Sequence, residues 1–498
     1  MKGNRNPKRV IRLILLQVMM AAILIQTLAG CAQPQENVEE KPVQTYAAPV
    51  DLPVNYRSND FTVKAGESDI DLYNAGNNSW NKPVSYGYFD IPTSSTIAVT
   101  PNFEFSSFEL VPRSLGIKGE RSGNTITFKL NGPANVSLVV DGNYQGKVLH
   151  LFAESPETDI PDPTDPNVIY FGPGFHDLGE YGTPPTMIKS NQTLYISGGA
   201  VVRGRFRADH ATNITIRGRG IILNDYRAQD EYDDIALALN YVTKSTVRDI
   251  IVNRDTNSWT SSMHGNSDVE VINYKAVSPR YASSDGFNIV SSHDIVFDGS
   301  FIHSADDSLA IKGLSQEEDP AKALPVYNIT YKNAQLWADG NNAIGIGAET
   351  VAAYFKNIHF NNIDVLYNFD DRDHPDGLTD RSAINIFALH GTEFSDISFE
   401  NIRVEKAKRL INIQMDTTFY FGAIQGSWAW PGSIKGIRYK DITSYSDGTN
   451  EIKVQGWSKD RMISDVIFDN IKINGKKVKA VDDPHFTINQ YAENVHVK

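Results

Sequence analysis

Three aspartates in one short stretch carry the clearest chemical signal of this 498-residue sequence. Asp285 lies in the segment Ser-Ser-Asp-Gly, and Asp306 and Asp307 form a pair whose first member follows Asp285 by 21 residues. Carboxylates held close together repel one another, which raises the pKa of at least one of them. Hydrolysis of a glycosidic bond needs such a set, because one carboxylic acid must stay protonated while an ionised partner activates water.

The spacing of these aspartates has chemical meaning only in a fold that stacks one residue above another. In a helix of stacked β-coils, 21 residues make about one tight coil, so Asp285 would lie beside the Asp306-Asp307 pair on an outer face. Adjacent strand residues point to opposite faces, so both members of the pair can reach one cleft only at a bend or bulge. Asp also caps turns, which is the simpler explanation of an isolated Asp-Asp pair. The Asp-Gly one coil upstream favours the catalytic interpretation.

A repeated segment pattern supports such a fold in the C-terminal two-thirds of the chain. Each repeat starts with Asn, Asp or Gly, continues with apolar residues at alternate positions, and is followed by a second short β-run. The repeats begin at Asn213, Asp268, Asp294, Asn328, Asn357, Asp396, Gly436 and Asp465. From Asp268 onward the intervals are 26, 34, 29, 39, 40 and 29 residues, with no helical period. This pattern predicts a right-handed parallel β-helix over residues 162–498, because stacked coils bury a core that no single unit could form alone.

Residues 51–161 show a different pattern of short apolar runs separated by Asn-Gly, Asp-Gly and Ser-Gly turns. Such spacing predicts a small β-sandwich and makes the whole fold all-β. Strands are expected at Ser95–Val99, Ser107–Val111, Thr125–Leu130, Val136–Val140 and Lys147–Phe152. We find no catalytic constellation in this segment and interpret it as an accessory or packing domain. Residues 32–50 are polar and contain proline, as in a linker.

The first 31 residues have the layout of a secretory signal. Five basic residues precede an apolar stretch from Leu13 to Leu28, and Leu28-Ala29-Gly30-Cys31 resembles a bacterial lipobox, whose cysteine is acylated. A plain transmembrane anchor, or a cleaved signal with an incidental cysteine, is the alternative. Lipidation of Cys31 predicts an exported protein of the bacterial cell envelope that contacts the membrane surface only through its lipid anchor.

Cysteine content and charge narrow the remaining classes. Cys31 is the only cysteine, so the folded part contains no disulfide and no cysteine-ligated metal. The formal net charge is −13, and an acidic surface repels nucleic acid. We therefore expect no nucleic-acid partner, and we expect a monomer.

The stretch around the aspartates resembles the polygalacturonase family of glycoside hydrolases, whose motif is Asn-Thr-Asp-Gly followed one coil later by Asp-Asp. The resemblance covers roughly residues 165–480 and is sharpest at Asp285-Gly286, Asp306-Asp307 and Ala310-Ile311-Lys312. The same clan includes β-helical dextranases with an N-terminal β-sandwich. The resemblance implies an inverting hydrolase of an α-linked polysaccharide or oligosaccharide. It also implies that Asp306 is the general acid, that Asp285 and Asp307 hold the water, and that catalysis uses no metal or other cofactor.

The sequence departs from the family motif at three places. Ser283-Ser284 replaces Asn-Thr, and the expected Gly-His-Gly aligns with Asn341–Gly347, which contains no histidine. The family's Arg-Ile-Lys, which holds the carboxylate of a galacturonate, aligns with Asn385-Ile386-Phe387. Loss of both cations removes charge-assisted bonds to a sugar carboxylate. A pectin-type substrate follows from the resemblance, and a neutral α-glucan, as for a dextranase, is the alternative.

Five further residues are candidates for substrate binding. Lys312 lies at an odd offset from Asp307, so strand alternation places it opposite Asp307 and on the side of Asp306. Trp259 and His264 lie one coil before Asp285 and offer aromatic faces to sugar rings. Asn342 takes a place in the segment that lacks the family histidine, and Arg381 ends a long acidic insertion that starts at Asn368. Each also has a plain structural explanation, as a surface, core or loop residue.

Two other classes of protein share the same scaffold. A β-helical polysaccharide lyase would need a catalytic Arg or Lys and usually Ca²⁺. A non-catalytic glycan-binding protein of the cell surface would need only the cleft.

Overall fold

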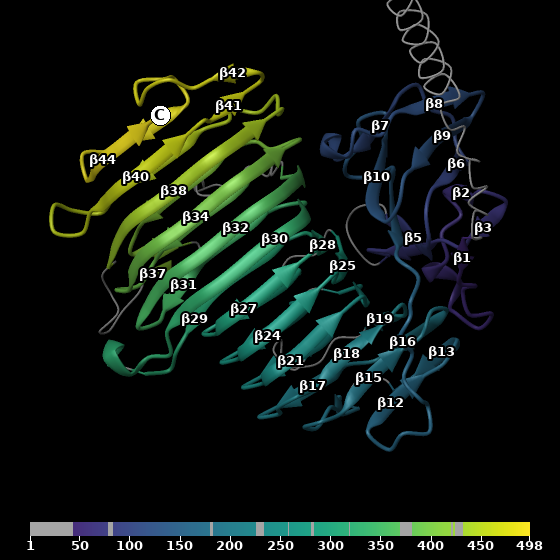
Figure 1. Cartoon of the computed structure of the whole chain (residues 1–498). Coiled ribbons are helices and arrows are strands. Elements are labelled where there is room, and N and C mark those ends of the chain that lie inside the picture. Colours follow the sequence, from purple (N-terminus) through teal and green to yellow (C-terminus); the bar gives the residue numbers. More distant parts are fainter. Residues whose placement is uncertain are drawn as a thin grey trace, which may run out of the picture. The chain divides into compact units, whose positions relative to one another are not determined.

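Short β-strands make up nearly all of the regular structure, as the alternating apolar residues and frequent turn residues predict (Figure 1). The structure is a computed structural model. It describes residues 43–77, 83–179, 183–225, 234–256, 258–279, 283–317, 319–368, 381–419, 422–423 and 432–498, so the signal segment with Cys31 lies outside the described residues. Val43–Lys498 form one compact unit. In the described part of the chain, 3₁₀ turns lie at Val54–Tyr56, Arg113–Leu115 and Pro320–Lys322. Within the described ranges, no helix has the length and apolar character needed to cross a membrane.

Two antiparallel sheets pack face to face in the N-terminal part of this unit. The first has the order β1-β5-β11-β10-β7, with β4 beside β5, and includes one parallel pair, β5 with β11. Its strands are β1 (Gln44–Thr45), β4 (Tyr73–Ala75), β5 (Val84–Asp90), β7 (Phe108–Val111), β10 (Ala134–Val140) and β11 (Val148–Glu154). The second has the order β3-β2-β6-β9-β8. Its strands are β2 (Phe61–Ala65), β3 (Ser68–Ile70), β6 (Ser95–Pro101), β8 (Gly119–Ser122) and β9 (Thr125–Leu130). Val63, Ile97 and Ile126 of the second sheet share one buried core with Leu138 and Leu149 of the first, which makes this part a β-sandwich.

The rest of the unit is a right-handed parallel β-helix with three strands in each coil. One side of the helix is an 11-stranded parallel sheet, which we call the site sheet. Its strands are β14 (Thr186–Met187), β17 (Phe206–Asp209), β20 (Leu237–Asn240), β23 (Ser261–His264), β26 (Phe287–Val290), β29 (Leu309–Leu314), β31 (Ile344–Val351), β33 (Ile384–Ala388), β35 (Ile411–Met415), β39 (Ile452–Gln455) and β43 (Phe486–Ile488).

The other two sides form one continuous 20-stranded sheet, because in the later coils a single bent strand spans both sides. In the earlier coils each side has its own short strand: β12 (Val168–Phe171), β13 (Gly174–Asp177), β15 (Thr193–Ile196), β16 (Ala200–Arg203), β18 (Thr215–Gly218), β19 (Ile221–Asn224), β21 (Thr243–Arg248), β22 (Ile251–Arg254), β24 (Ser267–Ile272), β25 (Lys275–Ser278), β27 (His293–Asp298) and β28 (Phe301–Ser304). The later strands are β30 (Val326–Ala338), β32 (Tyr354–Tyr367), β34 (Glu393–Val404), β38 (Ser433–Ser444), β40 (Ile463–Asp469), β41 (Lys472–Ile473), β42 (Lys476–Lys477) and β44 (Ala492–Val497). A small antiparallel pair, β36 (Thr418–Phe419) with β37 (Gly422–Ala423), lies outside both sheets.

The first residue of each sequence repeat marks a backbone bend. All eight repeat-start residues, Asn213 to Asp465, have a positive φ, between 52° and 69°. This left-handed conformation is accessible to Gly and tolerated by Asn and Asp, which explains the residue types at these positions. The amide side chains also stack between coils: Asn357 Nδ2 donates to Asn328 Oδ1 at 2.6 Å.

The interior of the helix is a set of apolar ladders. Along the site sheet, Ile289, Ile311, Ile346 and Ile386 occupy one register position in successive coils and are fully buried. On the opposite side, Phe399 stacks on Tyr439 with ring centroids 4.8 Å apart. Inward residues are therefore used for packing, and chemistry is left to the outward residues of the site sheet and its turns.

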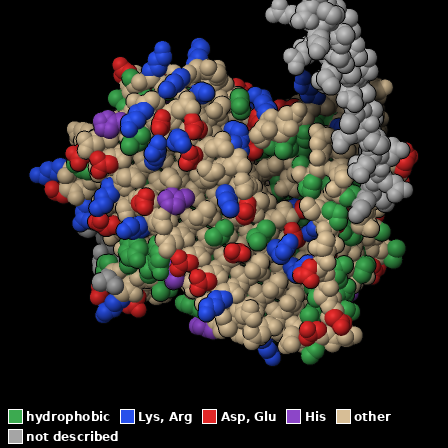
Figure 2. All heavy atoms as spheres, in the orientation of Figure 1, with side chains coloured by type: hydrophobic (Ala, Val, Ile, Leu, Met, Phe, Trp, Pro, Cys, Tyr) green, Lys and Arg blue, Asp and Glu red, His purple; other side chains and the backbone are tan. Residues whose placement is uncertain are grey.

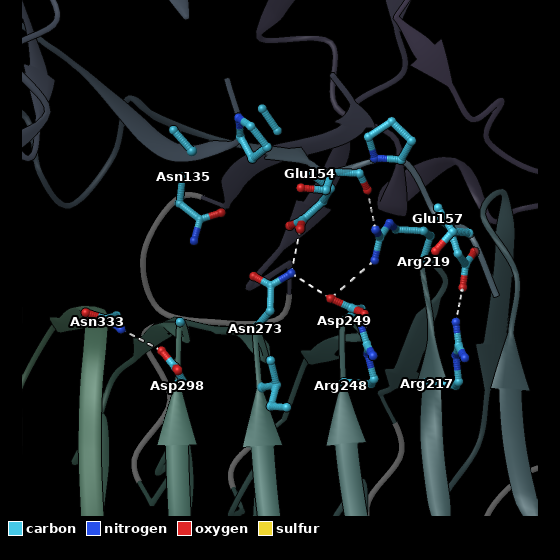
Figure 3. Close-up of a pocket in the computed structure, with 18 of the residues that line it drawn as sticks. Asn135, Glu154, Glu157, Arg217, Arg219, Arg248, Asp249, Asn273, Asp298 and Asn333 are labelled. Carbon is cyan, nitrogen blue, oxygen red and sulfur yellow. Dashed lines mark hydrogen bonds and ion pairs between the residues drawn. The ribbon is translucent and has the colours of Figure 1, made fainter. Parts of the chain in front are cut away.

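An apolar interface joins the sandwich to the helix. Tyr86 and Phe152 of the sandwich pack with Phe301 and Trp337 of the helix in one buried cluster. A cleft of about 790 Å³ lies beside this interface and is lined by charged residues of both parts (Figure 3). The charges pair within the cleft: Arg217 binds Glu157 at 3.4 Å, and Arg219 binds Asp249 at 3.4 Å.

Positive and negative side chains are mixed over the molecular face drawn in Figure 2. On that face Lys and Arg do not gather into a continuous band. Its charge pattern therefore gives no support to nucleic-acid binding.

Candidate active site

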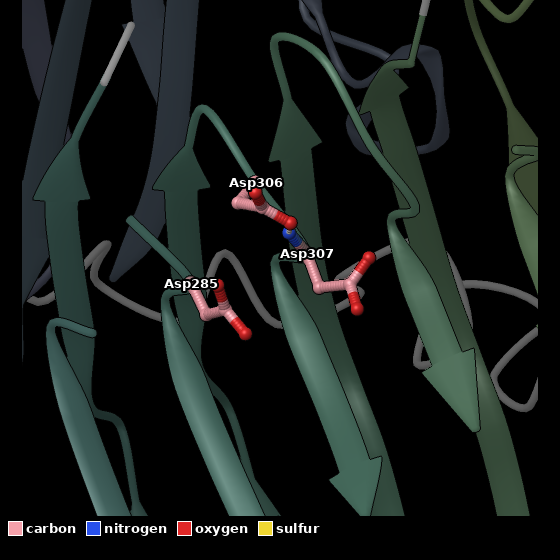
Figure 4. A group of neighbouring side chains, drawn as sticks. All are labelled: Asp285, Asp306 and Asp307. Carbon is pink, nitrogen blue, oxygen red and sulfur yellow. Dashed lines mark hydrogen bonds between the residues drawn. The ribbon is translucent and has the colours of Figure 1, made fainter. Parts of the chain in front are cut away.

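The stacking of the coils brings the three aspartates together, as their spacing predicts. Strand β26 pairs Phe287 with Leu309 of β29, and this register continues to Asp285 and Asp307, two residues before the strands. The backbone confirms the pairing, because Gly286 N–H donates to the carbonyl of Asp307 at 2.9 Å. One oxygen of each carboxylate lies within 4.8 Å of the others (Figure 4).

Glycine is required beside Asp285 because the coils approach closely there. A Cβ at Gly286 would lie 2.6 Å from the carbonyl oxygen of Ser308 and 2.1 Å from the side chain of Ile302. The Asp-Gly pair of the sequence is therefore a structural requirement of this turn as well as a mark of the site.

Asp306 is held at a bend before β29 and remains partly exposed. Its carboxylate accepts the backbone N–H of Asp307 at 3.0 Å, that of Ser283 at 3.2 Å and the side-chain amide of Asn341 at 2.5 Å. The bend allows both members of the pair to lie beside Asp285 on the same side of the coil, as their spacing predicts. Of the three carboxylates, Asp306 has the most contact with solvent, because Asp285 and Asp307 are buried.

Asp307 is fixed by Asn342. The Oδ1 atom of Asp307 accepts the backbone N–H of Asn342 at 3.0 Å and its side-chain amide at 2.8 Å. The Oδ1 atom of Asn342 in turn accepts the N–H of Ser382 at 3.0 Å. Asn342 is buried, and these bonds orient Asp307. Gly345 leaves room for the carboxylate, since a Cβ there would lie 3.0 Å from Asp307 Oδ2.

Lys312 reaches the cluster from the outer face of β29. Its Nζ donates to Asp285 Oδ2 at 3.1 Å, lies 3.6 Å from Glu349, and stands 4.6 Å from the ring centre of Trp259. Strand alternation predicts that Lys312 lies on the side opposite Asp307. This prediction is wrong, because Asp307 lies in a bend before β29 and alternation holds only within a strand. Lys312 faces the row formed by Asp285 and Asp307.

Burial and repulsion favour the protonated form of the cluster. Burial raises the pKa of Asp285 to about 7; Lys312 opposes the rise and Asp306 adds to it. Burial, and then the charges of Asp306 and Asp285, raise the pKa of Asp307 well above its ordinary value. Burial acts to lower the pKa of Lys312, but Asp285 and Glu349 outweigh it and the pKa rises well above its usual range. The site therefore holds an ammonium ion beside a carboxylate set that keeps a proton up to near-neutral pH.

The same three carboxylates are the group of described residues with the geometry to hold a metal ion. The ammonium of Lys312 already lies at hydrogen-bond distance from Asp285. It supplies at that carboxylate the positive charge that a cation would bring.

The other predicted binding residues fall on two sides of the cluster. Trp259 and His264 line a groove of about 650 Å³ that runs over the outer face of β17, β20 and β23. Burial lowers the pKa of His264, so it is neutral at neutral pH. Arg381 is buried, and its Nη1 donates to the carbonyl of Gly340 at 3.3 Å. Arg381 therefore braces the segment that precedes Asn341, and residues 369–380 of the preceding insertion lie outside the described residues.

Three residues near the site were not predicted from the sequence. Asn341 binds Asp306 and Glu349 pairs with Lys312, as described above, while His390 lies beside Glu349 and accepts the N–H of Thr350 at 3.1 Å on Nδ1. Burial lowers the pKa of His390 to about 4, so it is neutral. The Gly-rich segment at 341–347 was a usable signal for Asn341. Glu349 had none, because it lies within the register shift between β29 and β31, where no residue of β29 pairs with it.

The comparisons with known proteins give the family of this β-helix and its carboxylate cluster. Residues 207–491 match the glycosyl hydrolases family 28, and this match is more than half of the 498 residues. The chain therefore belongs to glycosyl hydrolase family 28. Comparison with curated protein sequences gives no significant match.

Solved structures with the same architecture span nearly the whole chain. Dex49A from Penicillium minioluteum superposes with a TM-score of 0.59 at 13% identity, covering 92% of this chain and 97% of its own. The family 28 exopolygalacturonase of Yersinia enterocolitica gives a TM-score of 0.48 at 12% identity, covering 82% of this chain and 96% of its own. The likeness to Dex49A shows that the fold of the chain, all-β with a parallel β-helix, is shared with that solved structure.

Proposed function

We propose that this protein hydrolyses glycosidic bonds of an α-linked polysaccharide or oligosaccharide by general acid–base catalysis. The observation that carries the proposal is the cluster of Asp285, Asp306 and Asp307, two of them buried with raised pKa values and one open to solvent. Asp306 donates a proton to the leaving oxygen, because it is the carboxyl that a substrate can reach. Asp285 and Asp307 hold the attacking water, and the member of this coupled pair that is ionised takes its proton.

The same burial supports inversion of configuration. One oxygen of each carboxylate lies within 4.8 Å of the other two. This distance is closer to the separation of about 5–5.5 Å between the carboxyl groups of retaining enzymes than to the roughly 6.5–9.5 Å of inverting ones. Retention, however, needs a carboxylate that can bond to the anomeric carbon. Asp285 is held by Lys312 and Asp307 by Asn342, and at 2% and 5% exposure they can reach a water but not a sugar ring. Proton NMR of the first product tests this point, and a product that keeps the substrate's anomeric configuration would refute inversion.

The family supports a pectin-type substrate with galacturonate units. A polygalacturonase-like activity would release reducing ends from polygalacturonate. Lys312 would then serve both the carboxylates and the sugar.

The charges of the carboxylate cluster and of the groove lined by Trp259 and His264 favour a second candidate substrate, a neutral α-glucan. Lys312 is engaged by Asp285 and Glu349, and Arg207, in the groove, is paired with Asp209 at 2.9 Å. The register position of Ala310 leads through Gly345 to Asn385 in β33, and Phe387 follows two residues later on the same face; the resembling family has Arg and Lys at these two places. A uronate would approach a carboxylate cluster with few opposing charges, whereas a neutral ring would meet amides and aromatic faces.

One experiment separates these possibilities. Reducing-sugar release from polygalacturonate, rhamnogalacturonan and dextran is measured for the wild type and for Asp285→Asn, Asp306→Asn and Asp307→Asn. We expect each substitution to lower kcat by about 10²–10⁴-fold, the usual weight of a general acid or base. Ultraviolet absorbance of an unsaturated product, lost on addition of a chelator, would indicate a lyase instead. If the wild type binds glycan but does not turn it over, and the three variants bind equally well, the protein would be a surface glycan-binding protein.

We also propose that the mature protein is exported and held at the cell envelope through lipid on Cys31. The support is the signal-like sequence before this single cysteine. A lipid anchor would leave the β-helix free in the aqueous phase beside the membrane.

A further inference from the structure

A row of buried polar side chains runs from the sandwich into the helix. Ser137 Oγ lies 2.7 Å from Nδ1 of His150, His150 Nε2 lies 2.9 Å from Nδ1 of His303, and His303 Nε2 lies 3.1 Å from Oδ2 of Asp339. Ser137 and His150 come from β10 and β11 of the sandwich, whereas His303 is in β28 and Asp339 follows β30. The Nε1–H of Trp337 donates to the second oxygen of Asp339 at 3.0 Å.

The row lies inside an apolar interface, where polar groups are costly unless they are bonded. His150 and His303 are fully buried, and their rings contact Phe301 and Trp337 at centroid distances of 4.8 and 4.9 Å. Because a carboxylate only accepts, His303 Nε2 is the donor to Asp339. In a neutral row His150 Nε2–H then donates to His303, and Ser137 Oγ–H donates to His150. The bonds on both nitrogens of each imidazole fix the two ring orientations.

Both helix members of the row lie just before residues of the candidate active site. His303 precedes Asp306 by three residues, and Ser304 Oγ between them donates to the carbonyl of Asp306 at 2.9 Å. Asp339 precedes Asn341 and Asn342, whose amides hold Asp306 and Asp307. The bond from His303 to Asp339 therefore joins the segment that carries the Asp-Asp pair to the segment that orients it. Asp339 N–H adds a second link by donating to the carbonyl of Ser304 at 2.8 Å.

We propose that His150 is a positioning residue of the hydrolase proposed above, acting on Asp306 and Asp307 through His303 and Asp339. The sandwich then takes part in building the active site. Loss of the bond from His150 removes one of the contacts that orient the ring of His303, and with it the fixed direction of the bond to Asp339. The two segments beyond it then lose their fixed spacing, and positional errors of about 1 Å are enough to cost on the order of 10²-fold in rate.

Two amide substitutions at position 150 provide the test. The amide of Gln reaches the place of His Nε2 and can donate to His303, whereas the shorter Asn reaches only the place of Nδ1, beside Ser137. We expect His150→Gln to keep kcat within about threefold of the wild type. We expect His150→Asn to lower kcat by tenfold or more with KM nearly unchanged, because the groove does not contact this residue.

Tyr86→Phe is the matched control. The hydroxyl of Tyr86 accepts Nδ2 of Asn253 at 3.0 Å, so this variant also loses one buried hydrogen bond between sandwich and helix, but at β22, away from the carboxylates. We expect a similar fall in Tm and an unchanged kcat. An equal loss of kcat in His150→Asn and Tyr86→Phe, or no loss in either, would overturn the proposal.

Hydrogen exchange gives a readout that does not need activity. In His150→Asn, peptides that contain residues 304–308 and 339–343 should exchange faster than in the wild type, and in Tyr86→Phe they should not. If the wild type hydrolyses no glycan, the proposed function fails, yet this difference still decides the coupling. Unchanged exchange of both peptides in His150→Asn would refute the role of His150. If His150→Asn does not fold, Ser137→Ala, which releases only the far side of the His150 ring, should show the same two changes at smaller size, and their absence would count against the proposal.

Discussion

At the scale of single residues, the charge state of the carboxylate cluster governs the expected reaction. Burial and mutual repulsion raise the pKa of Asp285 to about 7 and that of Asp307 well above the ordinary value. Asp285 and Asp307 titrate as a coupled pair, so the cluster retains a proton until the pH passes about 7. We therefore expect kcat/KM to fall as pH rises through this value. A pH–rate profile from 4 to 9 checks the expectation, and a flat profile up to pH 9 would contradict it.

The same shifts predict an unusual pH dependence of stability. Because Asp285 and Asp307 have raised pKa values in the folded state, the folded protein binds more protons than the unfolded chain between about pH 4 and 7. The free energy of unfolding should therefore fall as pH rises through this range. Asp307→Asn removes one such group, so at pH 8 it should be more stable than the wild type, by an amount that shrinks as the pH is lowered, although nearly inactive.

Asp294 gives a control of opposite sign for this measurement. Hydrogen bonds from Asn328 and His293 lower the pKa of Asp294. Asp294→Asn should therefore lose stability at neutral pH and approach the wild type as pH falls below about 4. The free energy of unfolding of both variants is measured with denaturant at pH 4 and 8. If both variants change this free energy with the same sign relative to the wild type, burial at the site does not control the protonation of Asp307.

The sequence allowed the catalytic candidates to be found but not their supporting contacts. The sequence predicts that Asp285 lies close to Asp306 and Asp307, because 21 residues make about one coil and residues one coil apart lie side by side. Glu349 could not be found, since its position depends on a register shift between neighbouring strands. The side chosen for Lys312 was wrong for a related reason, as alternation holds only inside a strand.

At the scale of the elements, the repeat pattern was readable because its first residue has a conformational cause. Asn, Asp and Gly recur where the chain bends with a positive φ, and the alternating apolar residues that follow face the ladders of the core. The outer-face polar residues have no such pattern. The right-handed helix and the strands of the sandwich were therefore predictable, whereas the apolar interface between sandwich and helix was not.

Asn357 tests this explanation of the repeat. It has a φ of 56° and donates to Asn328 of the preceding coil. Asn357→Val places a β-branched residue in the left-handed region and removes the interstrand bond, so we expect a loss of about 2–4 kcal/mol in unfolding free energy. Asn357→Gly keeps the conformation and should lose about 1 kcal/mol. Chemical denaturation measures both, with the exposed neighbour Lys356→Val as control. Equal losses at 356 and 357 would mean that the bend is not the cause of the repeat.

At the scale of the whole molecule, the sandwich and the helix behave as one unit in this interpretation. The apolar cluster around Trp337 holds them together, and the His150–His303–Asp339 row connects that interface to the carboxylates. An accessory role was the expectation for the sandwich, because its sequence contains no catalytic constellation. A residue that positions a distant carboxylate leaves no local motif, which is why His150 could not be found from the sequence.

A lipid on Cys31 would hold the protein at a membrane. Cys31 follows an apolar stretch and is the only cysteine, so a lipid on this residue is the simplest attachment to a membrane. We expect the full-length wild type to sediment with membranes and to be released by detergent but not by high salt, since acyl chains rather than charges would hold it. Cys31→Ser removes the acylation site and should shift the protein to the soluble fraction or leave it with an uncleaved signal, while the activity of the released domain stays the same because residue 31 precedes the linker. Metabolic labelling with a radioactive fatty acid should mark the wild type alone, and equal labelling of Cys31→Ser would refute the anchor.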